Sequence, residues 1–215
     1  DAHAIIKQAA HAGHVGVTMH VVQHSPGSVW VLLQSYFFIP QVVAIALFPY
    51  LAELYVQGTL KLPRQECMCI LVQRALSAGQ PGPALAILHA VADAQQRRRW
   101  QPWLTPDDLV TLLRTAAATG CPEVVMHLVE QGVDVWSLLL GPPQPVCGIY
   151  DEHRLIRDTV AAVLFPYLLQ QYEEGRLEVS SKQLAALIYK ASLHNQPDAC
   201  LAMLRLSAAR QVLPT

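Results

Sequence analysis

The sequence predicts an all-α fold built from two copies of one multi-helix unit, and three observations support this. Hydrophobic residues make up 53% of the 215 residues and charged residues 14%, a composition that excludes a disordered chain. Alanine and leucine outweigh alternating β-branched residues, which favours helices over strands. Three blocks of the first half recur in the same order in the second half, and a repeated unit of about 100 residues must hold several helices.

The first block predicts a helical hairpin in each copy. Residues 4–23 align with residues 111–130, and the alignment places Gly13 on Gly120. Apolar periodicity interrupted at these glycines predicts two helices per copy. The expected helices span residues 4–12 and 15–24 in the first copy and residues 107–119 and 122–131 in the second.

The second block carries the sequence Phe-Pro-Tyr-Leu in both copies, at residues 48–51 and 165–168. It aligns residues 42–60 with residues 158–177, and both segments are expected to be helices that end near a glycine. Each proline lacks the backbone N–H that a helix interior needs, so it should kink its helix or start a new one. The Phe and Tyr side chains of this motif are expected in the core.

The third block aligns residues 74–88 with residues 190–204 and predicts another hairpin in each copy. The expected helices span residues 66–78 and 83–92 in the first copy and residues 181–193 and 197–208 in the second.

The blocks divide the chain into a first helical unit at 1–94, a connector at 95–104 and a second helical unit at 105–215. Thr105 precedes a proline and two aspartates, which predicts an N-cap at the start of the second unit. We expect the two units to form one continuous, α-solenoid-like domain.

The first hairpin of the second copy resembles an ankyrin repeat over about 20 residues. The residues that fit the ankyrin pattern are Ala116, Ala117, Gly120, Glu123, Val124, Val125, Leu128, Gly132, Asp134 and Val135. The ankyrin Thr-Pro-Leu-His opening is missing. The last hairpins are similar to pentatricopeptide and tetratricopeptide units. These resemblances imply a helical-repeat protein that binds other proteins or, in the pentatricopeptide case, single-stranded RNA.

One uncharged segment raises the question of membrane insertion. No Asp, Glu, Lys or Arg lies between Lys7 and Glu53, and residues 35–52 are almost long and apolar enough to span a bilayer. Pro40 and Pro49 should leave only a shorter helix between them. The aligned segment of the second copy carries charges, so we expect no membrane insertion and a helix that is buried or covered by a partner.

Charge and cysteine usage give no sign of a polyanion-binding or secreted protein. The formal net charge is −1, which is not the footprint of a nucleic-acid-binding chain. The five cysteines form no disulfide framework, which indicates reduced thiols and an intracellular, cytoplasmic or nuclear protein. Because the chain begins with Asp1, we expect it to be a fragment of a longer protein.

Histidine pairs are the best candidates for metal binding or catalysis. His11 and His14, and likewise His20 and His24, have helical ligand spacing, but neither pair has a third ligand nearby. No phosphate-binding glycine loop, dinucleotide fingerprint or nucleophile elbow occurs. We therefore expect surface or packing histidines, no metal, no cofactor and no enzymatic activity.

Two clusters are candidates for partner binding. The basic and aromatic residues at 97–103 could form a solvated connector, a protein contact or an RNA contact, and an apolar surface is expected from Val29 to Leu51. The residues selected are Arg97, Arg98, Arg99, Trp100, Trp103, Tyr36, Phe37 and Phe38. We expect a protein–protein interaction scaffold that receives a peptide or helix, or another copy of itself. The alternative is a pentatricopeptide-like module for single-stranded RNA.

Overall fold

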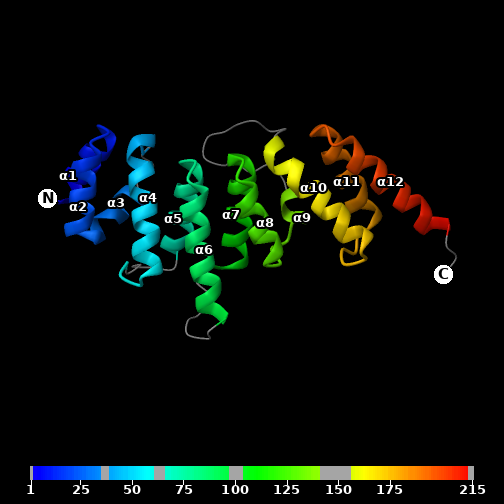
Figure 1. The fold of residues 1–215 in the computed structure, drawn as a ribbon, viewed down its shortest axis with the longest axis horizontal. Coiled ribbons are helices and arrows are strands. Elements are labelled where there is room, and N and C mark those ends of the chain that lie inside the picture. The colour runs from blue at the N-terminus through cyan, green and yellow to red at the C-terminus, as the bar shows by residue number, and fades with distance from the viewer. Residues whose placement is uncertain (1, 35–38, 61–65, 97–103, 141–155, 213–215) are drawn as a thin grey trace. The chain divides into compact units, whose positions relative to one another are not determined.

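A computed structural model describes residues 2–34, 39–60, 66–96, 104–140 and 156–212 of the chain. These residues form twelve α-helices and one short 3-10 helix and contain no strand (Figure 1). The elements are α1 (Ala2–His11), α2 (Val15–His24), η1 (Pro26–Ser28), α3 (Val29–Gln34), α4 (Gln41–Val56), α5 (Glu66–Ser77), α6 (Pro81–Gln96), α7 (Pro106–Thr119), α8 (Pro122–Glu130), α9 (Trp136–Leu139), α10 (Asp158–Glu173), α11 (Ser181–Leu193) and α12 (Pro197–Val212). The all-α class predicted from the sequence is confirmed.

The predicted helical hairpins begin and end close to the expected residues because their boundaries carry strong local signals. Gly13 separates α1 from α2 with a φ of +74°. At the start of α7 the backbone N–H of Asp108 donates to Thr105 Oγ1 at 3.1 Å, and the backbone N–H of Thr105 donates to the Asp108 carboxylate at 2.9 Å. The predicted N-cap at Thr105 is therefore confirmed. Ser180 and Gln183 form the equivalent capping box at α11.

The interior prolines do not divide their helices, contrary to the expectation of a shorter helix between Pro40 and Pro49. Both α4 and α10 are continuous helices of 16 residues that contain Pro49 and Pro166. Both prolines are exposed. The carbonyl groups one turn earlier, which lose their helical donor, therefore lie on the solvent side, where water can hydrogen-bond to them.

Three short elements were not predicted. η1 and α3 follow α2 directly, and α9 is a helix of four residues after α8. Segments this short show no helical period in the sequence, and their stability comes from packing. Leu32 and Leu33 of α3 and Leu138 and Leu139 of α9 are buried.

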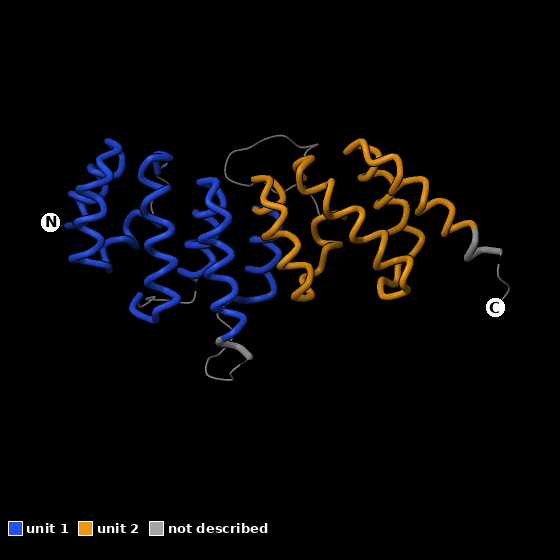
Figure 2. Tube along the Cα trace, in the orientation of Figure 1, with its two compact units in different colours: residues 1–115 blue, residues 116–215 orange. Residues whose placement is uncertain are grey.

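The chain divides into two compact units, Asp1–Thr115 and Ala116–Thr215 (Figure 2). In the first unit α1, α3 and α5 contact one another in succession, and so do α2, α4 and α6, which gives two layers of helices. In the second unit α8, α10 and α12 contact one another in succession, and α9 contacts α11. The core of each unit lies between its layers.

The boundary between the compact units falls inside α7 and does not coincide with the connector predicted at 95–104. The first ten residues of α7 belong to the first unit and the last four to the second. α6 also continues to Gln96, into the predicted connector. Residues 97–103 of that connector lie outside the described residues.

Candidate protein-binding surface

The outward side of α4 carries an apolar stripe. Val42, Ile45 and Val56 are each more than half exposed, and Pro49 and Glu53 lie between them on the same side and are exposed. Steps of three and four residues keep side chains on one face of a helix. We call these five residues the α4 stripe. Four of them are apolar, and Glu53 contributes the single carboxylate.

The opposite side of α4 fixes the helix in the core. Val43, Ala44, Leu47, Phe48 and Leu51 are almost completely buried, and α4 contacts α2 and α6. Burying side chains of this size stabilises the fold by about 1.5 to 3 kcal/mol each. Because the inward side is so heavily packed, α4 cannot rotate to hide its stripe.

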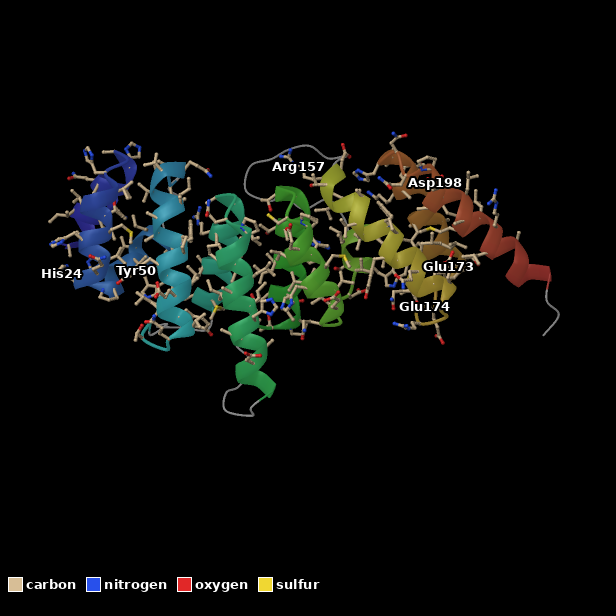
Figure 3. The ribbon with its side chains drawn as sticks, in the orientation of Figure 1. His24, Tyr50, Arg157, Glu173, Glu174 and Asp198 are labelled. Carbon is tan, nitrogen blue, oxygen red and sulfur yellow. The ribbon has the colours of Figure 1, made fainter. Side chains whose placement is uncertain are left out.

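The aligned face of α10 has a different chemistry. The residues that align with the α4 stripe are Thr159, Ala162, Pro166, Gln170 and Glu173, and all are exposed. Val42, Ile45 and Glu53 thus align with Thr, Ala and Gln. Val56 aligns with Glu173. Figure 3 shows Glu173 and Glu174 together at the C-terminal end of α10. The aligned face of α10 is therefore less apolar than the α4 stripe, and its exposed large apolar side chain is Val163, at 42%.

The surroundings of the α4 stripe are almost free of charge. Glu53 accepts a hydrogen bond from Gln57 Nε2 at 3.0 Å, and no other Asp, Glu, Lys or Arg occurs between Lys7 and Glu53. The neighbouring helix α2 exposes His20 and His24, whose ring centroids are 4.1 Å apart. A partner that covers the stripe would therefore strip water from few charges, which favours an apolar contact.

Aromatic residues of the Phe-Pro-Tyr-Leu motif lie in and beside the core. Phe48 and Phe165 are buried, as predicted, whereas Tyr50 and Tyr167 are only half-buried. Tyr50 lies on α4 (Figure 3). Burial also raises the pKa of Tyr55, the other tyrosine of this helix.

The residues selected from the sequence cannot be placed against this surface. Arg97, Arg98, Arg99, Trp100, Trp103, Tyr36, Phe37 and Phe38 all lie outside the described residues, as does the proline-rich segment at 141–148. Sequence reasoning marked the uncharged stretch before Glu53 but did not single out Val42, Ile45 or Val56. The signal that finds them is the difference from the aligned positions in the second copy.

Burial raises the pKa of three cysteine thiols. The pKa of Cys69 rises to about 12, and the Asp108 carboxylate adds to the shift. Burial also raises the pKa of Cys121 and of Cys200. Because the thiolate is the reactive form, Cys69 is a poor nucleophile at neutral pH.

Polar contacts in the second unit hold helix ends together. His194 is buried at the end of α11, and its Nδ1 lies 3.0 Å from Oδ1 of Asp158 at the start of α10. Arg157 (Figure 3) donates from its backbone N–H to the Ala117 carbonyl and from Nε to the Ala118 carbonyl, each at 3.0 Å. These contacts join α7, α10 and α11 and have a structural role.

The histidines do not gather into a metal centre. Across the parts of the chain that the structure describes, no three His, Cys, Asp or Glu side chains are placed to hold a metal ion. His24 Nδ1 instead lies 2.8 Å from the His20 carbonyl, one turn earlier. None of the described helices is long and apolar enough to cross a membrane.

Comparisons of the chain with protein-family models, with curated proteins and with solved structures found no match.

Proposed function

We propose that the chain is a non-enzymatic helical-repeat scaffold that binds a partner protein through the α4 stripe. The proposal has two steps. The chain contains two copies of one unit arranged as stacked helical hairpins, in a solenoid-like manner. The first copy has then acquired a binding surface that the second lacks.

Backbone conformation also supports the duplication. Left-handed residues occur at matching positions of the two copies: Gly13 and Gly120 after the first helix, Gly58 and Gly175 after the proline-containing helix, and Gly79 and Asn195 in the last hairpin. In the last pair the residue type differs but the φ values, +66° and +53°, agree. Asn is among the few residues other than glycine that adopt this conformation readily. A shared backbone explains this better than chance.

The single observation that carries the binding function is the exposed apolar stripe on α4 at positions that are mostly polar on α10. Exposed apolar patches of this kind mark interaction sites. The spacing of Val42, Ile45, Pro49 and Val56 suits a partner helix that lays its own apolar side along α4.

The partner we infer is an amphipathic helix of another protein. A polyanion such as RNA would need a basic surface, and the α4 stripe contains one carboxylate and no Lys or Arg. The free cysteines Cys67, Cys69, Cys121 and Cys200 are in keeping with action inside the cell.

A matched pair of substitutions tests the proposal. Ile45→Asp places a charge in the centre of the stripe, and Ala162→Asp places the same charge at the aligned, exposed position of α10. Each variant and the wild-type chain would be used as bait for quantitative affinity capture, with and without RNase. We expect a protein recovered equally by wild type and Ala162→Asp, with at least about a tenfold loss for Ile45→Asp, because a buried unpaired charge costs about 2 kcal/mol or more.

The same experiment can overturn the proposal. Equal recovery by all three baits would show that α4 is not the binding surface. Loss of every partner on RNase treatment would replace protein binding with RNA binding. Both substituted positions face solvent, so we expect all three baits to fold. Circular dichroism of each bait checks this.

A further inference from the structure

Glu53 is the charged residue of the α4 stripe, and its neighbours along the stripe are apolar. Pro49 lies four residues before it and Val56 three residues after it, on the same exposed side of α4. Its carboxylate accepts one hydrogen bond, from Gln57 Nε2 at 3.0 Å, and no Lys or Arg among the described residues pairs with it. Because a carboxylate has about four acceptor sites, Glu53 keeps most of its hydrogen-bonding capacity for water or a partner.

The end of α10 has the same amide–carboxylate pair in the reverse order. Gln170 aligns with Glu53, and Glu174 aligns with Gln57. Gln170 Nε2 donates to Glu174 Oε1 at 2.9 Å, and Arg176 Nη2 lies 2.9 Å from Glu174 Oε2. The carboxylate of this pair therefore lies after the last residue of α10 and next to a cation.

In the first copy the carboxylate lies one turn earlier, and a threonine stands at the position of the cation. Thr59 aligns with Arg176, and its hydroxyl donates to the Leu54 carbonyl at 2.9 Å. Glu53 lies in the last turn of α4, where the partial negative charge of the helix end does not stabilise a carboxylate. The difference between the copies thus places a charge within the apolar stripe without a stabilising contact to a cation.

A partner that covers the α4 stripe must meet this carboxylate. Removing water from an unpaired carboxylate is costly, and the cost is offset when a cation with hydrogen-bond donors replaces the water. Lys and Arg are the side chains that supply such donors. Their long apolar stems also suit contact with Pro49 and Val56, which flank Glu53.

We infer that Glu53 selects the partner: the helix that binds the α4 stripe carries a Lys or Arg opposite Glu53. This inference rests on the proposed function, because it names the chemistry of the partner at the same surface. Glu53 lies in the last turn of α4, whereas Val42 and Ile45 lie in its first two turns. The position of the cation along the partner helix therefore also sets the direction in which that helix runs along α4.

Selection from a displayed library of amphipathic helical peptides tests this inference. The library keeps leucine on one face of the peptide helix and randomises the positions that flank this face. The baits are the wild-type chain, Glu53→Gln, Glu53→Lys and the matched control Glu173→Gln, which removes an exposed carboxylate from α10. Peptides are counted only if their recovery falls with Ile45→Asp, because these bind the stripe.

The expected result is a basic residue that depends on Glu53. Wild type and Glu173→Gln should enrich Lys or Arg at one peptide position, and Glu53→Gln should not. Glu53→Lys should enrich Asp or Glu at that position, because the charge on the stripe is reversed. Circular dichroism of each bait verifies folding.

The affinity of one peptide selected by wild type measures the contact directly by fluorescence anisotropy. Changing its basic residue to Gln should weaken binding to wild type about tenfold and binding to Glu53→Gln less than about threefold, since the contact is already absent there. Added NaCl should weaken the binding of the unchanged peptide to wild type more than its binding to Glu53→Gln.

The outcomes separate this inference from the proposed function. If no peptide is recovered, or if Ile45→Asp lowers the recovery of none, the α4 stripe does not bind helices and both proposals fail. If Ile45→Asp abolishes binding but no basic residue depends on Glu53, the stripe binds a helix and selection by Glu53 is wrong. Equal losses for wild type and Glu53→Gln when the peptide loses its basic residue would also overturn the inference, because the cation would then contact another group.

Discussion

Gly120 shows how one missing side chain positions a helix. Its φ is +81°, and a Cβ atom there would lie 3.2 Å from both Arg157 Cγ and Thr159 Oγ1. The gap lets Arg157, which precedes α10, donate two hydrogen bonds to carbonyl groups at the end of α7. Gly120 therefore ends one helix and admits the start of another.

Gly120→Ala should destabilise the chain more than Gly132→Ala does. Both positions have a left-handed φ, which costs a non-glycine residue about 1 to 2 kcal/mol, but nothing lies within 4 Å of a Cβ at Gly132. The additional clash at Gly120 should lower the free energy of unfolding by roughly a further 1 to 3 kcal/mol. Urea denaturation followed by circular dichroism measures the difference, and equal losses would mean that Arg157 and Thr159 do not pack on Gly120.

Cys69 should make the stability of the chain fall at alkaline pH. Below the ordinary thiol pKa of 9.0 the group is protonated in both the folded and unfolded chain. Between that value and the folded pKa of about 12 only the unfolded chain releases the proton, so stability falls as pH rises, by up to about 1.4 kcal/mol per pH unit.

Urea denaturation of wild type and Cys69→Ala at pH 8 and pH 10 tests this. The fall in unfolding free energy should be smaller in the variant, because the other groups with raised pKa values, Tyr55, Cys121 and Cys200, remain in both chains. Identical falls in both chains would contradict a protonated Cys69 thiol in the folded state.

At the scale of the helix, prediction from sequence succeeded where the boundary was encoded locally. Thr105, Gly13 and Ser180 lie at helix ends because their own side chains or φ angles define those ends. The sequence did not predict α3 and α9, because these helices are too short to show the helical period of apolar residues. The helix predicted across residues 42–60 is confirmed, but the shorter helix expected between Pro40 and Pro49 is wrong, because α4 continues through the exposed Pro49.

The segment that carries the candidate surface was predictable from the sequence, but the side chains that it exposes were not. The absence of charge before Glu53 marks α4 in the printed sequence. Which third of that helix is exposed depends on the packing of α2 and α6 against it, and this packing involves residues distant in sequence. Val42 and Val43 are indistinguishable by letter, yet one is more than half exposed and the other is buried.

Pro49→Ala should stabilise α4. The substitution restores the backbone donor for the Ile45 carbonyl in the middle of a 16-residue helix, and an interior proline costs a helix about 3 kcal/mol. Because water can hydrogen-bond to a carbonyl on this exposed side, we expect a gain in unfolding free energy of about 1 to 3 kcal/mol.

Pro122→Ala is the matched control, because Pro122 is the first residue of α8, where no helical donor is missing. It should change stability by less than about 0.5 kcal/mol. Thermal unfolding of both variants gives the comparison. A loss of stability for Pro49→Ala would mean that the core around Phe48 is fitted to a bend that the proline imposes.

At the scale of the whole molecule, the proposed duplication implies that the two copies differ most where the chain is free to differ. The motif Phe-Pro-Tyr-Leu and the left-handed residues match, since the core and the turns constrain them. Divergence is concentrated on exposed positions, such as Ile45 against Ala162, and at the first and last hairpins. The shared positions therefore indicate the fold, and the divergent exposed positions are the candidates for function.

The last hairpin should open more readily than its counterpart in the first copy. The buried apolar side chains of α5 and α6 are Cys67, Met68, Cys69, Leu71, Val72, Ala75, Leu76, Ala84, Ile87, Leu88 and Val91, whereas those described for α11 and α12 are Leu187, Ala191, Ala199 and Met203. Less buried apolar surface lowers the free energy of local opening. At low protein concentration, amide hydrogens of α11–α12 should exchange at least about tenfold faster than those of α5–α6, a difference of about 1.4 kcal/mol.

Hydrogen exchange with mass spectrometry resolves the two hairpins in one experiment. Equal protection of α11–α12 and α5–α6 at low concentration would show that the last hairpin does not open as a separate unit. Stability would then be shared between neighbouring hairpins and would not depend on the apolar surface that each hairpin buries.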